Sequence, residues 1–298
     1  MEKSKLPLVS VVIPVFNGSV FVEQAVKSVL KSTYKNYEIL LIDDCSTDQS
    51  KKNCQALEKK YKNVRFYAFE TNKGLGRVLN FALRQARGKY ICRINQDDQM
   101  HPTRISKQVK FLRAHPKVVL LGSWLLVEDE IGNHRINKYL EDDEQIKKTW
   151  LKLSPCWDAS VMYLRQAALD VGGYDQRFWP SDDLHMWYRL GMIREIANLQ
   201  EPLTKIKFHS GAASMKYHRK HMETTYKVHR WAHKNVSKAS ISTQLYWFGQ
   251  LMAGYLFPAK FNWFIYRLLK KYIFYRLSGW QKETVQTADN WLQLNYAS

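Results

Sequence analysis

The chain has 298 residues and is 45% hydrophobic, enough for one large α/β domain, with or without an appendage, around a substantial core. Its formal net charge of +19 exceeds what solubility requires and indicates an anionic partner such as nucleic acid, lipid headgroups or phosphorylated substrates. Four scattered cysteines, Cys45, Cys54, Cys92 and Cys156, exclude a closely spaced zinc motif or disulfide framework and suit a reducing cytosol. The basic start of the chain lacks the pattern of a signal peptide.

Strands and helices are predicted to alternate through the first hundred residues. Runs of β-branched and apolar residues predict strands at Val9–Val15, Glu38–Ile42, Val64–Phe69 and Tyr90–Ile94. Apolar residues at helical spacing predict helices at Phe21–Leu30, Gln49–Tyr61 and Leu75–Ala86. This alternation predicts an α/β fold with a mostly parallel, twisted sheet flanked by helices.

Polar side chains recur where the predicted strands end. Asn17, Asp43, Asp44, Asp97 and Asp98 follow three different strands. Any one of them could be a turn former or a helix cap, but their recurrence favours a ligand site, because open α/β sheets bind ligands at the carboxyl ends of their strands. The adjacent carboxylates of Asp97 and Asp98 suit a hard divalent ion such as Mg²⁺ or Mn²⁺, and a solvated loop is the alternative.

The composition changes in the last third of the chain. Residues 201–298 contain 15 Lys and Arg against 4 Asp and Glu, and aromatic residues are frequent there. We place a boundary near residue 230, between an α/β domain over 1–230 and a basic, aromatic, helical region over 231–298. The apolar run Leu245–Ala259 is too short to span a bilayer comfortably, which favours an interfacial or buried helix.

The following segment has an apolar and a basic face at helical spacing. The apolar face comprises Phe261, Phe264, Ile265, Leu268, Tyr272 and Tyr275, and the basic face comprises Lys260, Arg267, Lys270 and Lys271. Such a helix suits the headgroup region of an anionic membrane. The alternative is that the apolar face packs against the rest of the chain.

Five motifs occur in an order that resembles one known family. They are VSVVIPVFN, LLIDDCSTDQS, TNKGLGRVLNFAL, GKYICRINQDDQMHPTRISKQVKFL and VGGYDQRFWPSDDLHMWYRL. Together they resemble the family 2 glycosyltransferases, inverting enzymes with the GT-A fold, over about residues 8–215. The resemblance implies a Rossmann-like nucleotide-sugar-binding and catalytic domain over 1–230. It also implies a bacterial enzyme of polysaccharide or lipopolysaccharide biosynthesis, a group in which lipid-linked acceptors are common.

The resemblance implies a donor site at the strand ends. The residues expected to bind the nucleotide, with uridine diphosphate favoured, are Pro14, Phe16, Asn17, Asp44, Asn72 and Asn95. The residues expected to bind Mn²⁺ or Mg²⁺ are Asp97, Asp98 and His209. The chain departs from the family pattern at Asn95, which replaces a carboxylate, and at Cys45, which replaces a glycine. A lone histidine such as His209 is alternatively an ordinary surface or core residue.

The resemblance also implies the acceptor side of the site. Asp183 matches the catalytic base that takes the proton of the acceptor hydroxyl, and Asp182 is expected to orient it. Either aspartate could instead only cap the helix that follows. Trp157 and Asp158 are expected on the acceptor side, where relatives often have His in place of Asp158.

The sequence therefore predicts a metal-dependent, inverting glycosyltransferase. It should transfer a sugar from a nucleotide diphosphate to a hydroxyl of a glycan or lipid-linked saccharide, in the cytoplasm and peripherally on the inner face of the membrane. Two alternatives stay open: a nucleic-acid or anionic-surface binding protein, and a catalytically silent scaffold, which Asn95 favours. Nucleic acid is not the expected partner, because a groove lined by strand-end carboxylates repels phosphate.

Overall fold

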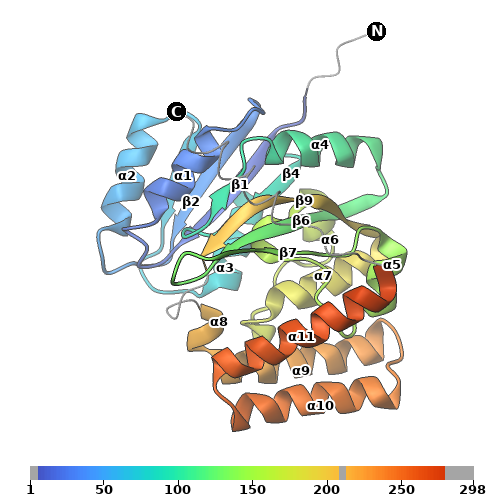
Figure 1. Cartoon of the computed structure of the whole chain (residues 1–298). Coiled ribbons are helices and arrows are strands. Elements are labelled where there is room, and N and C mark those ends of the chain that lie inside the picture. The colour runs from blue at the N-terminus through green and yellow to red at the C-terminus, as the bar shows by residue number, and fades with distance from the viewer. Residues whose placement is uncertain (1–5, 208–212, 279–298) are drawn as a thin grey trace.

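The computed structural model describes residues 6–207 and 213–278 (Figure 1). Its strands are β1 (Val9–Val15), β2 (Tyr37–Asp43), β3 (Val64–Ala68), β4 (Tyr90–Arg93), β5 (Gln99–Met100), β6 (Val118–Glu128), β7 (His134–Asn137), β8 (Met162–Leu164) and β9 (Glu195–Lys207). Its helices are α1 (Val22–Leu30), α2 (Ser50–Lys60), α3 (Leu75–Gln85), α4 (Arg104–Ala114), α5 (Asp143–Thr149), α6 (Arg165–Asp170), α7 (Asp182–Ile193), α8 (Ala213–Lys216), α9 (His218–Asn235), α10 (Ile241–Leu256) and α11 (Ala259–Ser278).

The strands form one sheet in the order β3-β2-β1-β4-β8-β6-β9-β5, with β7 paired to β6. The four strands predicted from the sequence form a parallel half, in which Val15 pairs with Asp43 and both strands end at the same edge. The second half is mixed, because β8 runs antiparallel to both β4 and β6. The predicted α/β class with its helical C-terminal region is therefore confirmed, although antiparallel pairs are more frequent than the alternation alone indicated.

Two layers of helices cover the sheet, and alternate residues of each strand face opposite layers. Val11 and Ile13 of β1 pack with α1, α2 and α4, whereas Val12 packs with α3, α6 and α7. All three side chains are at most 1% exposed. Burial of this kind contributes roughly 1.5–3 kcal/mol for each large apolar side chain, which fixes the register that aligns the strand ends.

Two turns at the carboxyl ends of β1 and β2 require left-handed backbone. Asn17 has φ of 47° and Cys45 has φ of 62°. Asn tolerates this region well, whereas Cys does not, so Cys45 occupies a position at which glycine would cost less. The geometry explains why the matching position of the family motif is a glycine.

The helices α9, α10 and α11 stack beside α7, below the sheet in Figure 1. Trp247 of α10 is 1% exposed and donates its indole hydrogen to the Leu151 carbonyl at 2.6 Å. Its ring also stacks on His229 of α9 at 5.0 Å, so α10 is anchored to the rest of the fold. The boundary near residue 230 stays a proposal, and α9 continues through that position. None of the helices in the described ranges is long and apolar enough to cross a membrane.

Candidate active site

A cleft of about 1550 Å³ lies between the carboxyl edge of the sheet and the C-terminal helices. It is lined by all but two of the residues predicted for the site: Pro14, Phe16, Asn17, Asp44, Asn72, Asn95, Asp97, Asp98, Trp157, Asp158 and Asp183. Parallel strand pairing brings the residues at the strand ends together. The helix α7, from the second half of the chain, adds Asp183. The exceptions are Asp182 and His209, and His209 lies outside the described residues. The roles assigned to these residues stay predictions.

Phe16 is an exposed aromatic side chain at the end of β1. It is 47% exposed and lines the cleft. Its backbone amide donates to Gln96 Oε1 at 2.9 Å, and its carbonyl accepts from Gln96 Nε2 at 3.0 Å. This two-point contact fixes the backbone while leaving the ring face open, an arrangement suited to stacking on a nucleobase. Sequence reasoning did not identify Gln96, whose only signal is its place beside the carboxylate pair.

The neighbouring polar residues hold the loops of the donor end in place. Asp44 accepts hydrogen bonds from the backbone amides of Lys73 at 2.7 Å and Gly74 at 2.9 Å. Asn72 donates to the Asp44 carbonyl at 3.2 Å, and Asn17 accepts from the Thr47 amide at 2.8 Å. These contacts account for part of each side chain's hydrogen-bonding capacity, so the residues have a structural task in addition to any contact with a nucleoside.

The loop after β4 carries the predicted metal ligands. Asp98 is 4% exposed and accepts from Asn95 Nδ2 at 3.0 Å. Burial raises the pKa of Asp98 well above its usual range, and the adjacent charge of Asp97 raises it further. A divalent ion would relieve this repulsion. Mg²⁺ and Mn²⁺ accept one or two carboxylates with phosphate oxygens completing the shell, so the two residues fit such an ion. Within residues 6–207 and 213–278, no third His, Cys or carboxylate joins them.

A buried arginine connects the loop after β4 to Asp158. Arg93 is fully buried, and its Nη2 lies 2.6 Å from Asp158 Oδ2 and 3.1 Å from Asn95 Oδ1. Its Nη1 donates to the carbonyls of Val12 and Ile94, each at 3.2 Å. Burial lowers the pKa of Arg93, but Asp158 together with Tyr174 and Tyr163 raises it by more, so Arg93 is charged. The signal that sequence reasoning overlooked is a single arginine inside an otherwise apolar strand.

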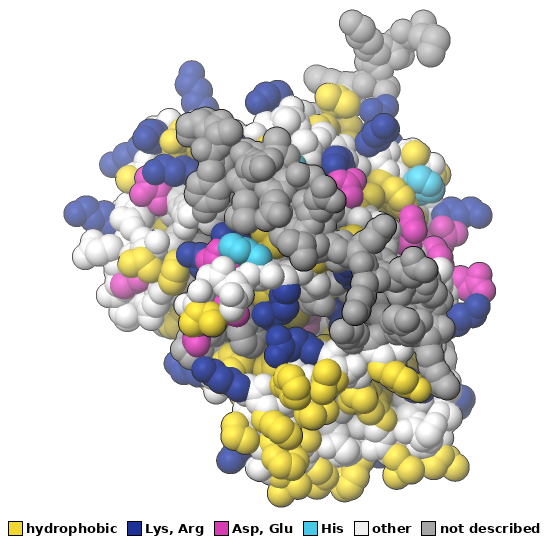
Figure 2. Space-filling model, viewed as in Figure 1, with side chains coloured by type: hydrophobic (Ala, Val, Ile, Leu, Met, Phe, Trp, Pro, Cys, Tyr) yellow, Lys and Arg dark blue, Asp and Glu magenta, His cyan; other side chains and the backbone are white. Residues whose placement is uncertain are grey.

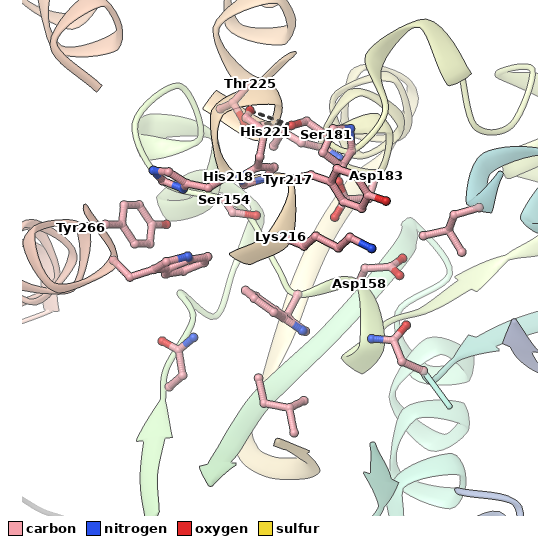
Figure 3. A pocket seen from close by; sticks show the side chains of 18 of the residues that line it. Ser154, Asp158, Ser181, Asp183, Lys216, Tyr217, His218, His221, Thr225 and Tyr266 are labelled. Atoms are coloured by element: carbon pink, nitrogen blue, oxygen red, sulfur yellow. Dashed lines mark hydrogen bonds between the residues drawn. The ribbon is translucent and has the colours of Figure 1, made fainter. Parts of the chain in front are cut away.

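Asp183 lies in the first turn of α7 and lines the cleft. Its Oδ1 accepts from the Leu184 amide at 2.7 Å. Burial raises the pKa of Asp183, and the negative charges of Asp158 and Asp182 raise it further. Figure 3 shows Asp183 and Asp158 on the same side of the cleft. Neither α7 aspartate is the N-cap residue, which is Ser181, and no side chain caps the helix there.

Asp182 is not among the residues that line the cleft. It is 3% exposed, and its Oδ2 lies against the start of α3, only 2.7 Å from where a Cβ at Gly76 would be. Burial raises the pKa of Asp182 to about 7. Asp182 was predicted on the acceptor side together with Asp183, but its carboxylate lies against the start of α3. The two residues differ because successive side chains in the first helical turn point in different directions.

The helix α9 fixes the start of α7. The Ser181 hydroxyl lies 2.8 Å from the Thr225 hydroxyl and 3.0 Å from that of Thr224, as the dashed contact to Thr225 in Figure 3 indicates. These hydroxyl pairs tie α9 to the residue at the start of α7, two positions before Asp183. Thr224 and Thr225 of α9 thus anchor the residue that precedes the two α7 aspartates.

The helix α11 lines the cleft on the side where Trp157 lies. Trp157 approaches Trp263 of α11 with 6.4 Å between ring centroids, and Tyr266 lines the same cleft. In Figure 3, Tyr266 enters the cleft from the side opposite Asp158. Aromatic rings offer flat apolar surfaces to sugar rings. The sequence left open that the aromatic tail packs against the rest of the chain, but it did not place the tail at the cleft.

Comparison with known proteins agrees with this geometry. The Glycosyl transferase family 2 model matches residues 10–172. The putative glycosyltransferase EpsE of Bacillus subtilis is 32% identical over 213 residues, which cover 69% of this chain and 75% of that protein. The chain also matches three Rickettsia glycosyltransferases, but it spans only about a third of their length.

Solved structures show the same fold. S. aureus TarS 1-349 in complex with UDP-GlcNAc has a TM-score of 0.61 at 16% identity, covering 96% of this chain and 79% of that one. The mannosyltransferase PcManGT of Pyrobaculum calidifontis, in complex with GDP-Man and Mn²⁺, has a TM-score of 0.61 at 14% identity, covering 97% and 80%. The fold is that of the GT-A glycosyltransferases. The chain belongs to glycosyltransferase family 2.

Proposed function

We propose that the protein transfers a hexose from a nucleoside diphosphate, with uridine diphosphate favoured, to an acceptor hydroxyl with inversion at the anomeric carbon. The observation that carries the proposal is the cleft itself, which joins the strand-end residues to Asp183 of α7. The solved structures with UDP-GlcNAc and with GDP-Man support a nucleotide-sugar donor.

Asp183 would act as the base. As the acceptor oxygen forms its bond to the anomeric carbon, its proton passes to the Asp183 carboxylate and the bond to the diphosphate breaks. The raised pKa of Asp183 makes its carboxylate a stronger base than an ordinary aspartate, provided that it is deprotonated. Asp158 would act through its negative charge. Its pairing with Arg93 would limit the negative potential that Asp158 adds around Asp183.

Asp97 and Asp98 would hold a divalent ion, with His209 as a further candidate ligand. When bound, such an ion supplies positive charge to the diphosphate leaving group. Around it, Phe16 would stack on the base, and Pro14, Asn17, Asp44, Asn72 and Asn95 would shape the nucleoside pocket. These assignments rest on the family motif and on the position of each side chain along the cleft.

We further propose that the enzyme works peripherally at the inner, anionic face of the cell membrane. The outer faces of α10 and α11 expose large apolar side chains beside basic ones (Figure 2). The exposed apolar residues are Leu245, Phe248, Tyr255, Leu256, Phe257, Phe261, Phe264, Ile265, Leu268, Leu269 and Tyr272. A patch of this kind suits insertion at the headgroup level. Lys270 is turned inward and cannot contribute to that attraction, and the side chains of Lys271 and Tyr275 lie outside the described part.

A thermal-shift panel tests the donor proposal. UDP, GDP, dTDP and CMP are compared with and without Mn²⁺, because a ligand that binds only the folded state raises its melting temperature. The expected result is a rise for one nucleoside diphosphate, UDP first, that depends on Mn²⁺. No shift with any nucleotide in the presence of Mn²⁺ would refute the proposal. If oligonucleotides instead raised the melting temperature without metal, the result would favour the nucleic-acid alternative. The carboxylates that line the donor end argue against that alternative.

A further inference from the structure

The segment after β1 is held by the side chains of two different loops. Each backbone amide of residues 16–19 donates a hydrogen bond to a side chain. Three of these bonds go to the segment that follows β2: Asn17 to Ser46 Oγ at 2.9 Å, Gly18 to Ser50 Oγ at 2.8 Å and Ser19 to Asp48 Oδ2 at 3.0 Å. The amide of Phe16 donates instead to Gln96, in the loop after β4. The residue that carries the exposed ring is therefore held from the loop of the predicted metal ligands.

A glutamine side chain is suited to this contact. Its amide has an acceptor oxygen and a donor nitrogen in one plane, so it can pair with the N–H and C=O groups of a single residue. Gln96 pairs with Phe16 in this way, at 2.9 and 3.0 Å, and we call this pair of hydrogen bonds the Gln96 clamp. Because about half of the Phe16 side chain is exposed, the position of its ring depends on how this backbone is held.

Gly18 leaves the space that the Gln96 side chain occupies. A Cβ atom at Gly18 would lie 2.1 Å from Gln96 Oε1 and 2.3 Å from its Cδ, closer than non-bonded atoms approach. The Gly18 carbonyl accepts from the Val22 amide at 3.0 Å, which fixes this backbone at the start of α1. The φ of Gly18 is outside the left-handed region, so the demand for glycine comes from the space alone. Alanine at this position would displace the end of the Gln96 side chain and open the clamp.

Gln96 also belongs to the turn that carries the predicted metal ligands. It lies between Asn95 and Asp97. Two hydrogen bonds close the turn, from the Asp98 amide to the Asn95 carbonyl at 3.3 Å and from Asn95 Nδ2 to Asp98 Oδ2 at 3.0 Å. A divalent ion held by Asp97 and Asp98 would fix this turn further, and with it the backbone from which the Gln96 side chain extends. The clamp thus connects the ion site to the ring.

We propose that Gln96 is a positioning residue that couples the divalent ion to the stacking of the nucleobase on Phe16. The proposal rests on the proposed glycosyltransferase function and adds to it an interdependence of two of its ligands. The ion raises the affinity of the site for the base through the protein as well as through the diphosphate. The base raises the affinity for the ion by the same factor, because coupling between two binding equilibria is reciprocal.

The first test separates the base from the diphosphate. Calorimetry with Mn²⁺ compares UDP with inorganic pyrophosphate, which has no base, on the wild type, on Gln96→Met and on the control Gln55→Met. Methionine cannot pair with the Phe16 backbone, and Gln55 is exposed on α2 and does not line the cleft. We expect the dissociation constant for UDP to rise roughly fivefold or more in Gln96→Met, and that for pyrophosphate to change less than about twofold. Equal loss for both ligands would show that Gln96 supports only the ion loop and would overturn the proposal.

The second test reaches the clamp from its other side. Gly18→Ala should raise the dissociation constant for UDP as Gln96→Met does, whereas Gly249→Ala, where a Cβ would meet no atom within 4 Å, should leave it unchanged. In Gln96→Ala, which has no side-chain end to displace, adding Gly18→Ala should cost less than about twofold. In Phe16→Ala, adding Gln96→Met should likewise have no effect, because Gln96 acts through the ring. Losses that multiply in either double variant would overturn the proposal.

The third test measures the coupling itself. Mn²⁺ binding is followed by electron paramagnetic resonance with and without uridine, which has no phosphate to reach the ion. Uridine should lower the dissociation constant for Mn²⁺ roughly fivefold in the wild type and leave it unchanged in Gln96→Met. Equal Mn²⁺ affinity with and without uridine in the wild type would overturn the coupling. Failure of the wild type to bind any nucleoside diphosphate with Mn²⁺ would overturn the proposed function itself, whereas wild-type UDP binding with unchanged affinity in Gln96→Met would overturn this inference alone.

Discussion

The substitution Arg93→Met tests whether the buried ion pair organises the site. Arg93 is fully buried and donates to Asp158, Asn95 and two carbonyl groups. Its removal leaves the Asp158 carboxylate, 17% exposed, without its counter-charge and takes one donor from each of the two carbonyls, of which the Val12 carbonyl keeps the Ile94 amide. Removing one partner of a buried pair costs roughly 3–5 kcal/mol, so we expect a loss of that size in the free energy of unfolding.

The assay is urea unfolding followed by tryptophan fluorescence on a double-mutant cycle. Asp158→Asn alone leaves a buried arginine without a carboxylate, and Arg93→Met/Asp158→Asn removes the pair together. The double variant should therefore lose roughly 1–3 kcal/mol less than the sum of the single losses. Losses that add to within ~0.5 kcal/mol would show that the pair is not energetically coupled and would refute the reasoning. Arg93→Met should also weaken UDP binding with Mn²⁺, because Arg93 holds Asn95.

Three further outcomes are expected. Asp183→Asn should keep donor binding while the rate of transfer falls by roughly 10²–10⁴, and comparable activity in the variant would place the base elsewhere. The wild-type kcat/KM should fall as the pH decreases through a pKa well above that of an ordinary aspartate, because only the carboxylate form accepts a proton. Burial lowers the pKa of His229 to about 3, whereas the unfolded chain protonates it near pH ~6.5. The free energy of unfolding should therefore be unaffected by His229 above pH ~6.5 and should fall by up to ~1.4 kcal/mol per pH unit below it. A melting temperature that declines as steeply with pH in His229→Gln would contradict this. Phe264→Ser/Leu268→Ser should reduce the salt-sensitive flotation of the protein with anionic liposomes, whereas Ile131→Ser, a control at another exposed apolar residue, should not. Equal loss of flotation in both variants would argue against peripheral contact, as would wild-type flotation that persists in high salt.

The elements nearest the donor end could be predicted because their signals are local. The strand β1 has the predicted bounds, and β2, β3 and β4 differ from prediction by at most a residue or so at each end. Apolar runs between turn residues determine such strands without reference to the rest of the chain. The clustering of strand-end residues then follows from parallel pairing, which aligns Val15 with Asp43.

The contacts that could not be predicted join distant parts of the sequence. The pairing of Arg93 with Asp158 spans 65 residues, and that of Lys270 with Asn137 spans 133. No periodicity encodes such a contact, which depends on how β8 and α11 return to the sheet. Lys270 was predicted on a basic face at the headgroups of an anionic membrane, but it is buried, because α11 turns that part of its surface toward β7. The direction of Asp182 likewise depends on packing against α3 rather than on its motif.

The central claim is that the strand-end carboxylates bind a divalent ion on which nucleoside diphosphate binding depends. Calorimetry of UDP and GDP binding, with Mn²⁺ and in excess chelator, tests it on the wild type and on Asp97→Ala. Asp97 lines the cleft beside the buried Asp98, so its loss should abolish the metal-dependent binding without unfolding the chain. We predict that one nucleoside diphosphate binds with Mn²⁺, and that none binds in chelator or to Asp97→Ala. Unchanged affinity for every nucleoside diphosphate in excess chelator would contradict it.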